Sequence, residues 1–148
     1  MQLVILAVGK ARGSAEQQLA KDWLERLPVS GSIHEIESKL PAGAKRTEDE
    51  GMRLLRAVPA GAALAILDPR GKDHSSEDLA ALISAWRDSG YGSAAFAIGG
   101  ADGHAAAIRQ KALRTISFGR ATWPHLLCRA MLAEQLYRAS MILAGHPY

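Results

Sequence analysis

The stretch SAAFAIGGADG, residues 93–103, joins a run of small and apolar residues to a pair of glycines. Such a run is typical of a strand covered on both faces, although periodicity alone does not separate it from a buried helix. We predict a central strand from Ala94 to Ile98. Because ligands of open α/β sheets lie beyond the carboxyl ends of strands, Gly99 and Gly100 mark either the floor of a ligand site or a tight turn that binds nothing.

Outward from this stretch, strand patterns alternate with helix patterns along the whole chain. The predicted strands are residues 3–8, 33–36, 62–67, 94–98 and 115–118. The predicted helices are residues 14–27, 47–58, 76–88, 103–112 and 125–144. This alternation predicts an α/β fold in which a mostly parallel sheet carries helices on both faces, within one domain that spans residues 1–148.

Local signals set some of the boundaries. Thr47 and Glu50 have the spacing of a capping box and predict a helix that begins at Thr47. Residues 68–71, Asp-Pro-Arg-Gly, predict a turn after the third strand. Residues 39–46, KLPAGAKR, combine proline, glycine and three basic residues and predict a mobile loop.

Composition indicates a soluble globular protein, with 48% hydrophobic and 22% charged residues in 148. No charged leader precedes an apolar core and no apolar run approaches a membrane span, so we expect a cytoplasmic protein. Cys128 is the single cysteine and is expected to be a small buried hydrophobe rather than a nucleophile. The five histidines lack metal-ligand spacing, so no metal is expected.

The charge is uneven along the chain. Residues 103–148 contain six Lys or Arg and one Glu, a balance of +5, so the total of +3 leaves −2 for the remainder. A basic surface beside a ligand site suggests a polyanionic partner such as nucleic acid, and a solvated basic face is the alternative.

The last predicted helix carries more apolar surface than contact with one sheet needs, which predicts a homodimer. Arg129 falls between its apolar stripes, where a cation needs an acidic partner or an anionic ligand. Glu134 and Arg138 have the spacing of an ordinary helical ion pair. The sequence contains no P-loop, no G-x-G-x-x-G after the first strand and no G-x-S-x-G, which argues against those nucleotide-binding and hydrolase classes.

Several ordered motifs together carry a family resemblance. They are Leu67-Asp68 with Gly71-Lys72, then AIGGADG at 97–103, ISF at 116–118, TWPH at 122–125, EQLYRA at 134–139 and HPY at 146–148. In this combination the chain closely resembles the SPOUT-class ribosomal RNA large subunit methyltransferase H family. The match runs from the first predicted strand to the last residue.

The resemblance implies methylation of N3 of a pseudouridine in large-subunit (23S) ribosomal RNA, with S-adenosyl-L-methionine as methyl donor. It also implies a homodimer in which the C-terminal part of each chain forms a trefoil knot, a feature that is otherwise almost absent from proteins. The RNA would be met in the large subunit or the assembled ribosome. The implied cofactor contacts are Leu67, Gly100 and the loop Phe118, Gly119, Arg120, Ala121, Thr122 and Trp123.

Further residues in the family motifs are candidates for the chemistry. Arg129 and Arg138 would position phosphate or base, and His146 and Tyr148 would shape the nucleotide pocket. His125 is a candidate for proton transfer. In the family the tail usually continues past His-Pro-Tyr with a further His and Arg, whereas the printed sequence ends at Tyr148.

Two alternatives to a methyltransferase follow from the residues. A non-catalytic RNA-binding or ribosome-associated α/β protein would bind RNA without turning over a cofactor. A Rossmann-type nucleotide-binding module would prefer NAD or ATP to S-adenosylmethionine.

Overall fold

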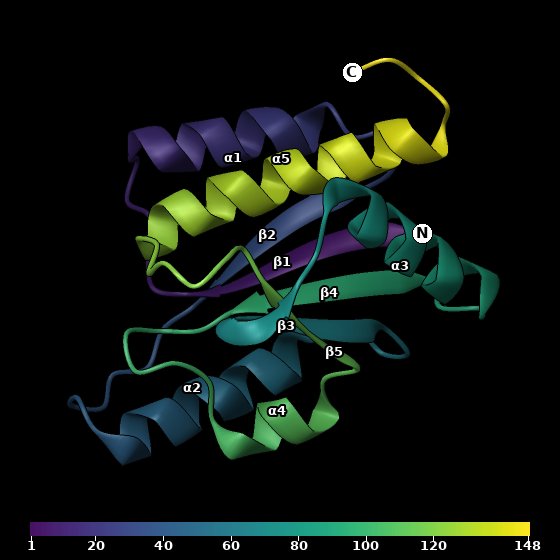
Figure 1. The fold of residues 1–148 in the computed structure, drawn as a ribbon. Coiled ribbons are helices and arrows are strands. Elements are labelled where there is room, and N and C mark those ends of the chain that lie inside the picture. Colours follow the sequence, from purple (N-terminus) through teal and green to yellow (C-terminus); the bar gives the residue numbers. More distant parts are fainter.

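The computed structural model describes residues 1–148 as a five-stranded sheet covered by five helices (Figure 1). The strands are β1 (Gln2–Val8), β2 (Gly31–Ile36), β3 (Ala63–Asp73), β4 (Ser93–Ile98) and β5 (Arg114–Ser117). The helices are α1 (Ala15–Glu25), α2 (Ala44–Ala57), α3 (Ser76–Asp88), α4 (Ala106–Lys111) and α5 (His125–Leu143). None of the helices is both long and apolar enough to cross a membrane.

The strands lie in the order β2-β1-β4-β3-β5, and all neighbours are parallel. β4 is the central strand, with Phe96 paired to Ile5 on one side and Ala65 on the other. Every residue from Ala94 to Ile98 is buried, as a strand covered on both faces requires. The predicted parallel α/β fold and its central strand are therefore confirmed.

The helices form a layer on each face of the sheet. α1, α3 and α5 cover one face, and α2 and α4 cover the other (Figure 1). Phe96, Leu132 and Leu136 are fully buried in the larger core beneath the first layer. Leu54, Ile66 and Ile108 occupy the smaller core beneath the second. Since β4 contributes to both cores, the glycines that follow it are held between the two layers.

Helix starts agree with sequence signals at α1 and α5 and differ at α2. Ser14 caps α1 and accepts a hydrogen bond from the Gln17 N–H, and α5 begins directly after Pro124. The prediction that Thr47 begins a helix is wrong, because α2 starts at Ala44 with Gly43 as its N-cap. The Thr47 hydroxyl instead donates to the Gly43 carbonyl from inside the helix. Residues 44–46 of the predicted mobile loop are therefore helical.

The predicted turn at residues 68–71 is also wrong in detail, because β3 continues through it to Asp73. Its pairing with β5 stops at Leu67 and resumes at Lys72, so Ile116 faces both residues. Such an irregularity bends a strand while the ladder continues on either side. Asp68 and Arg70 consequently lie in a bend beside the end of β4 rather than in a surface turn.

Candidate active site

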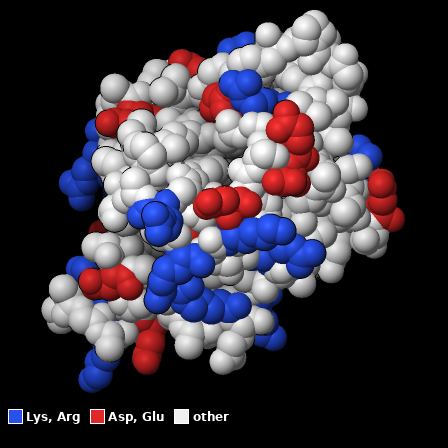
Figure 2. Space-filling view, viewed as in Figure 1, with Lys and Arg blue, Asp and Glu red and all other residues white.

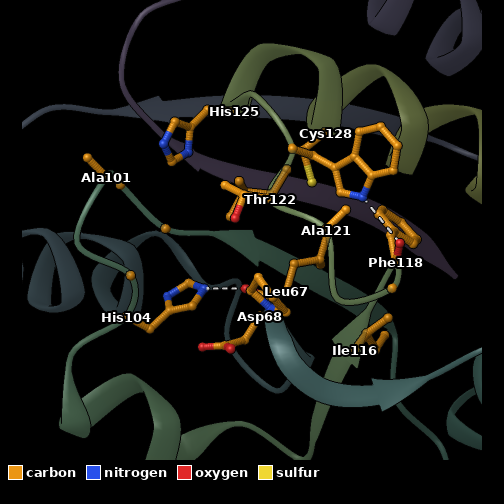
Figure 3. Close-up of a pocket in the computed structure, with 17 residues that line it drawn as sticks. Leu67, Asp68, Ala101, His104, Ile116, Phe118, Ala121, Thr122, His125 and Cys128 are labelled. Carbon is orange, nitrogen blue, oxygen red and sulfur yellow. Dashed lines mark hydrogen bonds between the residues drawn. The ribbon is translucent and has the colours of Figure 1, made fainter.

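The carboxyl ends of β3, β4 and β5 surround a cavity of about 190 Å³, which we call the glycine-rich cavity. Its walls come from the bend of β3, the loop after β4, the loop after β5 and the first turn of α5 (Figure 3). It is lined by Leu67, Asp68, Pro69, Ile98, Gly99, Gly100, Ala101, Gly103, His104, Ile116, Phe118, Gly119, Ala121, Thr122, Trp123, His125 and Cys128. This is where an α/β sheet presents a ligand site.

The loop between β5 and α5 is fixed by its own hydrogen bonds. The Ser117 hydroxyl accepts from the Gly119 N–H at 3.0 Å and donates to the Gly119 carbonyl at 2.8 Å. Gly119 has a φ of +97°, a conformation that side chains rarely tolerate. The Trp123 indole N–H donates to the Phe118 carbonyl at 3.2 Å (Figure 3). The loop therefore closes one side of the cavity as a shaped wall.

His104 lies in the wall below this loop. Its Nε2 is 3.1 Å from the Leu67 carbonyl oxygen, and only 8% of the residue is exposed (Figure 3). Burial lowers the pKa of His104, and the nearby Arg109 cation lowers it further. A neutral ring that donates from Nε2 leaves Nδ1 as an acceptor, and that buried nitrogen has no partner. His104 therefore holds the Leu67 carbonyl in place within the cavity wall.

Asp68 anchors two arginines at the edge of the cavity. Arg109 and Arg70 both form ion pairs with its carboxylate. Burial raises the pKa of Asp68, but hydrogen bonds from Arg70 and Arg109 outweigh that effect and hold it well below its usual range. The carboxylate therefore stays ionised and fixes both guanidinium groups.

The structure brings most of the predicted cofactor contacts together. Seven of the eight line the glycine-rich cavity, namely Leu67, Gly100, Phe118, Gly119, Ala121, Thr122 and Trp123. Arg120 is exposed and does not line it. Sequence reasoning missed His104, Ile98, Ile116 and Cys128. His104 directly follows the quoted glycine stretch, and Ile98 and Ile116 lie inside quoted motifs, so closer attention to each motif and its neighbours could have found them.

The predicted chemical residues divide into two groups. His125 lies at the start of α5 and lines the glycine-rich cavity. Arg129 is buried one turn further on, where it donates to Glu35 at 2.7 Å and to the carbonyls of Val8 and Gly9 at 3.0 and 2.8 Å. Its acidic partner is therefore Glu35.

Burial raises the pKa of the neighbouring Cys128 thiol to about 11, which disfavours a nucleophilic thiolate.

Arg138, His146 and Tyr148 lie at the opposite end of α5, a helix about 27 Å long. Arg138 pairs with Glu134 and lies over the Tyr148 ring at 3.9 Å, and the Tyr148 hydroxyl donates to Glu134 at 2.6 Å. His146 is exposed beyond the helix. The structure does not bring these three residues to the cavity of their own chain.

A basic groove lies beside the bend of β3 and is lined by Arg70, Lys72, Arg109 and Arg114 together with Asp68. Its net charge is +3, from four cations and one carboxylate. Figure 2 shows Lys and Arg side chains gathered on this face of the molecule. Two of the four cations come from β3, outside the basic C-terminal third that the sequence singled out.

Comparison with known proteins agrees with this geometry. The model of a family described as "Predicted SPOUT methyltransferase" matches residues 1–148. The chain is 49% identical to the ribosomal RNA large subunit methyltransferase H of Paramagnetospirillum magneticum, with all of the chain and 98% of that relative covered. It is 46% identical to the protein of the same name from Xanthobacter autotrophicus, again with 100% and 98% covered.

Two solved structures share the fold at low sequence identity. A probable methylase family protein from Haemophilus influenzae has a TM-score of 0.61 at 9% identity, and the chain covers 66% of its length. The SpoU methyltransferase AviRb from Streptomyces viridochromogenes has a TM-score of 0.51 at 14% identity, with 61% of its length covered. The matches extend over 97% and 99% of this chain, so they concern its whole fold.

Proposed function

This chain belongs to the SPOUT methyltransferase family, and from that membership we propose that it methylates N3 of a pseudouridine in large-subunit ribosomal RNA with S-adenosylmethionine. The observation that carries the proposal is the glycine-rich cavity. Segments from residues 67, 100 and 118–123, far apart in the sequence, meet there in the arrangement that the family resemblance implies for the cofactor.

The residues of the cavity suit S-adenosylmethionine. Leu67, Ile98, Ile116 and Phe118 offer apolar surface for an adenine ring. A Cβ at Gly99 would lie 3.1 Å from the backbone of Gly103, so a side chain there would force the loop to shift. We propose Leu67, Gly100, Phe118, Gly119, Ala121, Thr122 and Trp123 as cofactor contacts, with Arg120 at the exposed tip of the loop.

When bound, the cofactor supplies a methyl group on a positively charged sulfur. The protein then has to hold the nucleophile in line at near-attack distance, because alignment itself removes much of the barrier. The hydrogen-bonded loop 118–123 and the apolar walls would exclude water from this reaction. His125 is the polar side chain at the opening that is free to face an incoming base.

The basic groove supports RNA as the partner. Its four cations lie next to the glycine-rich cavity, because Asp68 borders both. Asp68 fixes Arg70 and Arg109 by ion pairs, so these guanidinium groups are already oriented for phosphate oxygens. We propose that the groove follows the RNA backbone where it passes beside the proposed cofactor site.

We also propose that the chain forms a homodimer through α1 and α5. An apolar groove between these helices is lined by Leu19, Trp23, Leu127 and Met131. Leu19 is 46% exposed in the single chain, whereas large apolar residues are usually buried. A second copy related by a two-fold axis would cover this groove with the same surface.

A dimer of this kind gives the distant C-terminal residues a role. If the two α5 helices pack antiparallel, the far end of one helix lies near the start of the other. We propose that Arg138, His146 and Tyr148 then serve the cavity of the partner copy rather than their own. The trefoil knot in each chain remains a prediction from the family resemblance.

The test of the cofactor assignment is calorimetric titration with S-adenosylhomocysteine, NAD and ATP. We expect saturable binding of S-adenosylhomocysteine alone, and loss of that binding in Gly100→Trp, whose side chain would clash with Glu50 and Val8 and displace the floor of the cavity. Circular dichroism checks that the variant folds. No binding at millimolar ligand would contradict the methyltransferase and favour an RNA-binding protein, and a preference for NAD or ATP would favour a nucleotide-binding module.

A further inference from the structure

A second cavity, of about 450 Å³, lies on the other side of the Gly100–Ala101 wall. We call it the charged cavity, because its lining includes Lys10, Arg12, Arg46, Glu50 and Arg129. Gly100, Ala101 and His125 line both cavities. The residues come from the loop after β1, from α2 and from α5, so the cavity also lies at the carboxyl end of the sheet, where ligands bind.

Two arginines of the charged cavity have guanidinium groups with N–H donors that are not engaged within the chain. Arg12 is exposed and forms no ion pair, and its φ of +50° is the only positive value among the non-glycine residues. Backbone strain of this kind tends to occur at functional sites. Arg46 lies 3.9 Å from Asp102, and its buried Nε has no hydrogen-bond partner. Guanidinium groups with free N–H donors match the oxygens of a phosphate.

Glu50 forms the floor of the charged cavity. It is buried, and its side chain forms no ion pair and no hydrogen bond, although such groups are normally paired. A Cβ at Gly100 would lie 2.9 and 3.1 Å from the two carboxylate oxygens, so the carboxyl group packs directly under the wall between the cavities. This packing places a carboxylate that has no direct ion pair next to the glycine-rich cavity.

The charges facing Glu50 come from three elements. Burial raises the pKa of Glu50. The charges of Arg46 and His125 lower this pKa, and the charges of Asp102 and Asp49 raise it. Arg46 is one helical turn away on α2 but pairs with Asp102, so it does not neutralise Glu50 directly. A carboxylate with a raised pKa holds a proton more readily than an exposed one, as a general base requires.

We propose that the charged cavity binds the target nucleotide of the RNA, with its phosphate on Arg12 and Arg46, and that Glu50 accepts the N3 proton of the base. This inference rests on the proposed function. The base would reach the methyl donor past Gly100 and Ala101, which line both cavities and carry no side chain larger than a methyl group.

The proton and charge balance are complete without a further reactant. The N3–H bond breaks, the proton passes to the Glu50 carboxylate, and the electron pair left on N3 forms the new bond to the methyl group. The bond between that methyl group and sulfur breaks, and its electron pair stays on sulfur. One positive charge on sulfur and one negative charge on Glu50 are lost together.

The test compares Glu50→Gln with the wild-type protein on ribosomes that lack the modification. Glutamine keeps the shape of the side chain beneath Gly100 but is not a base. We expect a single-turnover rate lower by about 100-fold or more, the usual contribution of a general base. We expect S-adenosylhomocysteine binding to stay close to wild type, thermal unfolding to occur no earlier than in wild type, and the rise of the wild-type rate with pH through the Glu50 titration to be absent.

Arg12→Gln and Arg46→Gln test the phosphate contacts. We expect each to weaken binding to ribosomes in the presence of S-adenosylhomocysteine by about tenfold, as loss of a charged hydrogen bond does, without a change in cofactor affinity. Arg87→Gln, an exposed arginine on α3 that lines neither cavity, is the control with the same charge change.

The possible outcomes separate this inference from the proposed function. Wild-type rates and pH dependence in Glu50→Gln, with unchanged ribosome binding in both arginine variants, would overturn the inference and leave the methyltransferase intact. Failure of the wild-type protein to methylate any RNA would overturn both.

Discussion

The two cavities that meet at Gly100 are built in different ways. The glycine-rich cavity consists mainly of backbone, apolar side chains and one self-bonded loop, and its polar groups are few. The charged cavity gathers four cations and two carboxylates from four parts of the chain. The first can hold a cofactor through shape and backbone groups, whereas the second has the charges to hold and deprotonate a nucleotide. One pair of glycines thus separates a binding site from a site for proton chemistry.

The largest expected effect is a loss of stability when Arg129, the buried arginine of the charged cavity, is replaced. Arg129 is 2% exposed and holds Glu35 and two backbone carbonyls, so Arg129→Ala leaves three acceptors without their donor. We predict a loss of about 3–5 kcal/mol in the free energy of unfolding, measured by urea denaturation. Arg120→Ala, at an exposed position without an ion pair, is the control. A loss below about 1 kcal/mol would mean that Arg129 behaves as an exposed pair does.

A second prediction tests the apolar character of the glycine-rich cavity through the reactivity of Cys128. Because burial raises the pKa of Cys128 from an ordinary 9.0 to about 11, its thiolate fraction at pH 8 should be about 100-fold below that of a free thiol. We predict correspondingly slow alkylation by iodoacetamide, followed by mass spectrometry. Since Cys128 lines the cavity, S-adenosylhomocysteine should slow it further. Alkylation as fast as that of glutathione would contradict a desolvated cavity wall.

A third prediction concerns His104, the buried polar side chain in that wall. His104→Ala removes the hydrogen bond to the Leu67 carbonyl and so loosens the cavity wall. We predict about tenfold weaker binding of S-adenosylhomocysteine by calorimetry, the size expected for one lost hydrogen bond. His74→Ala, which changes a half-buried histidine outside the cavity, should bind normally. Equal affinity in both variants would remove His104 from the proposed cofactor site.

The smallest effect is a contrast in pH dependence between Glu35 and Glu50. Burial raises the pKa of Glu35, but hydrogen bonds from Arg129 and the Ala11 N–H outweigh this effect. The pKa of Glu35 is therefore lowered from its ordinary value of 4.5. Ionised Glu35 therefore stabilises the fold above its unfolded pKa, and this stability is lost as pH falls through the folded pKa. Glu50 has a raised pKa, so its ionised form costs stability at neutral pH, and that cost disappears on acidification toward 4.5.

Urea denaturation at several pH values measures this contrast. Glu35→Gln should be less stable than wild type at pH 7, and Glu50→Gln should be more stable. Both differences should shrink toward pH 4. The same sign in the two variants would contradict the opposite environments that the structure gives these carboxyl groups.

Local patterns were sufficient for the parallel sheet and for the glycine-rich cavity. The run from Ala94 to Ile98 identified the central strand, and the motifs that carry the family resemblance contain most of the cavity wall. Each motif is a short run of neighbouring residues, although the motifs themselves lie far apart in the sequence. The bend of β3 was missed because a turn and an interrupted strand have the same residues, and only pairing with the distant β5 separates them.

The charged cavity could not be predicted in the same way. Arg12, Arg46, Glu50 and Arg129 are brought together by folding and share no motif. Glu50 was interpreted as part of a capping box with Thr47, whereas α2 starts at Ala44 and turns Glu50 inward under Gly100. Arg129 was expected to need an acid or an anionic ligand, and the structure supplies Glu35, which no spacing rule connects to it.

The most direct measurement incubates unmodified ribosomes with the protein and isotopically labelled S-adenosylmethionine, digests the ribosomal RNA and locates the label by mass spectrometry. We predict one labelled methyl group, on N3 of a pseudouridine in the large-subunit RNA, with wild-type protein and with Arg87→Gln. Glu50→Gln should label it far more slowly. An RNA that stays unlabelled, although the protein binds both S-adenosylhomocysteine and ribosomes, would contradict the proposed function.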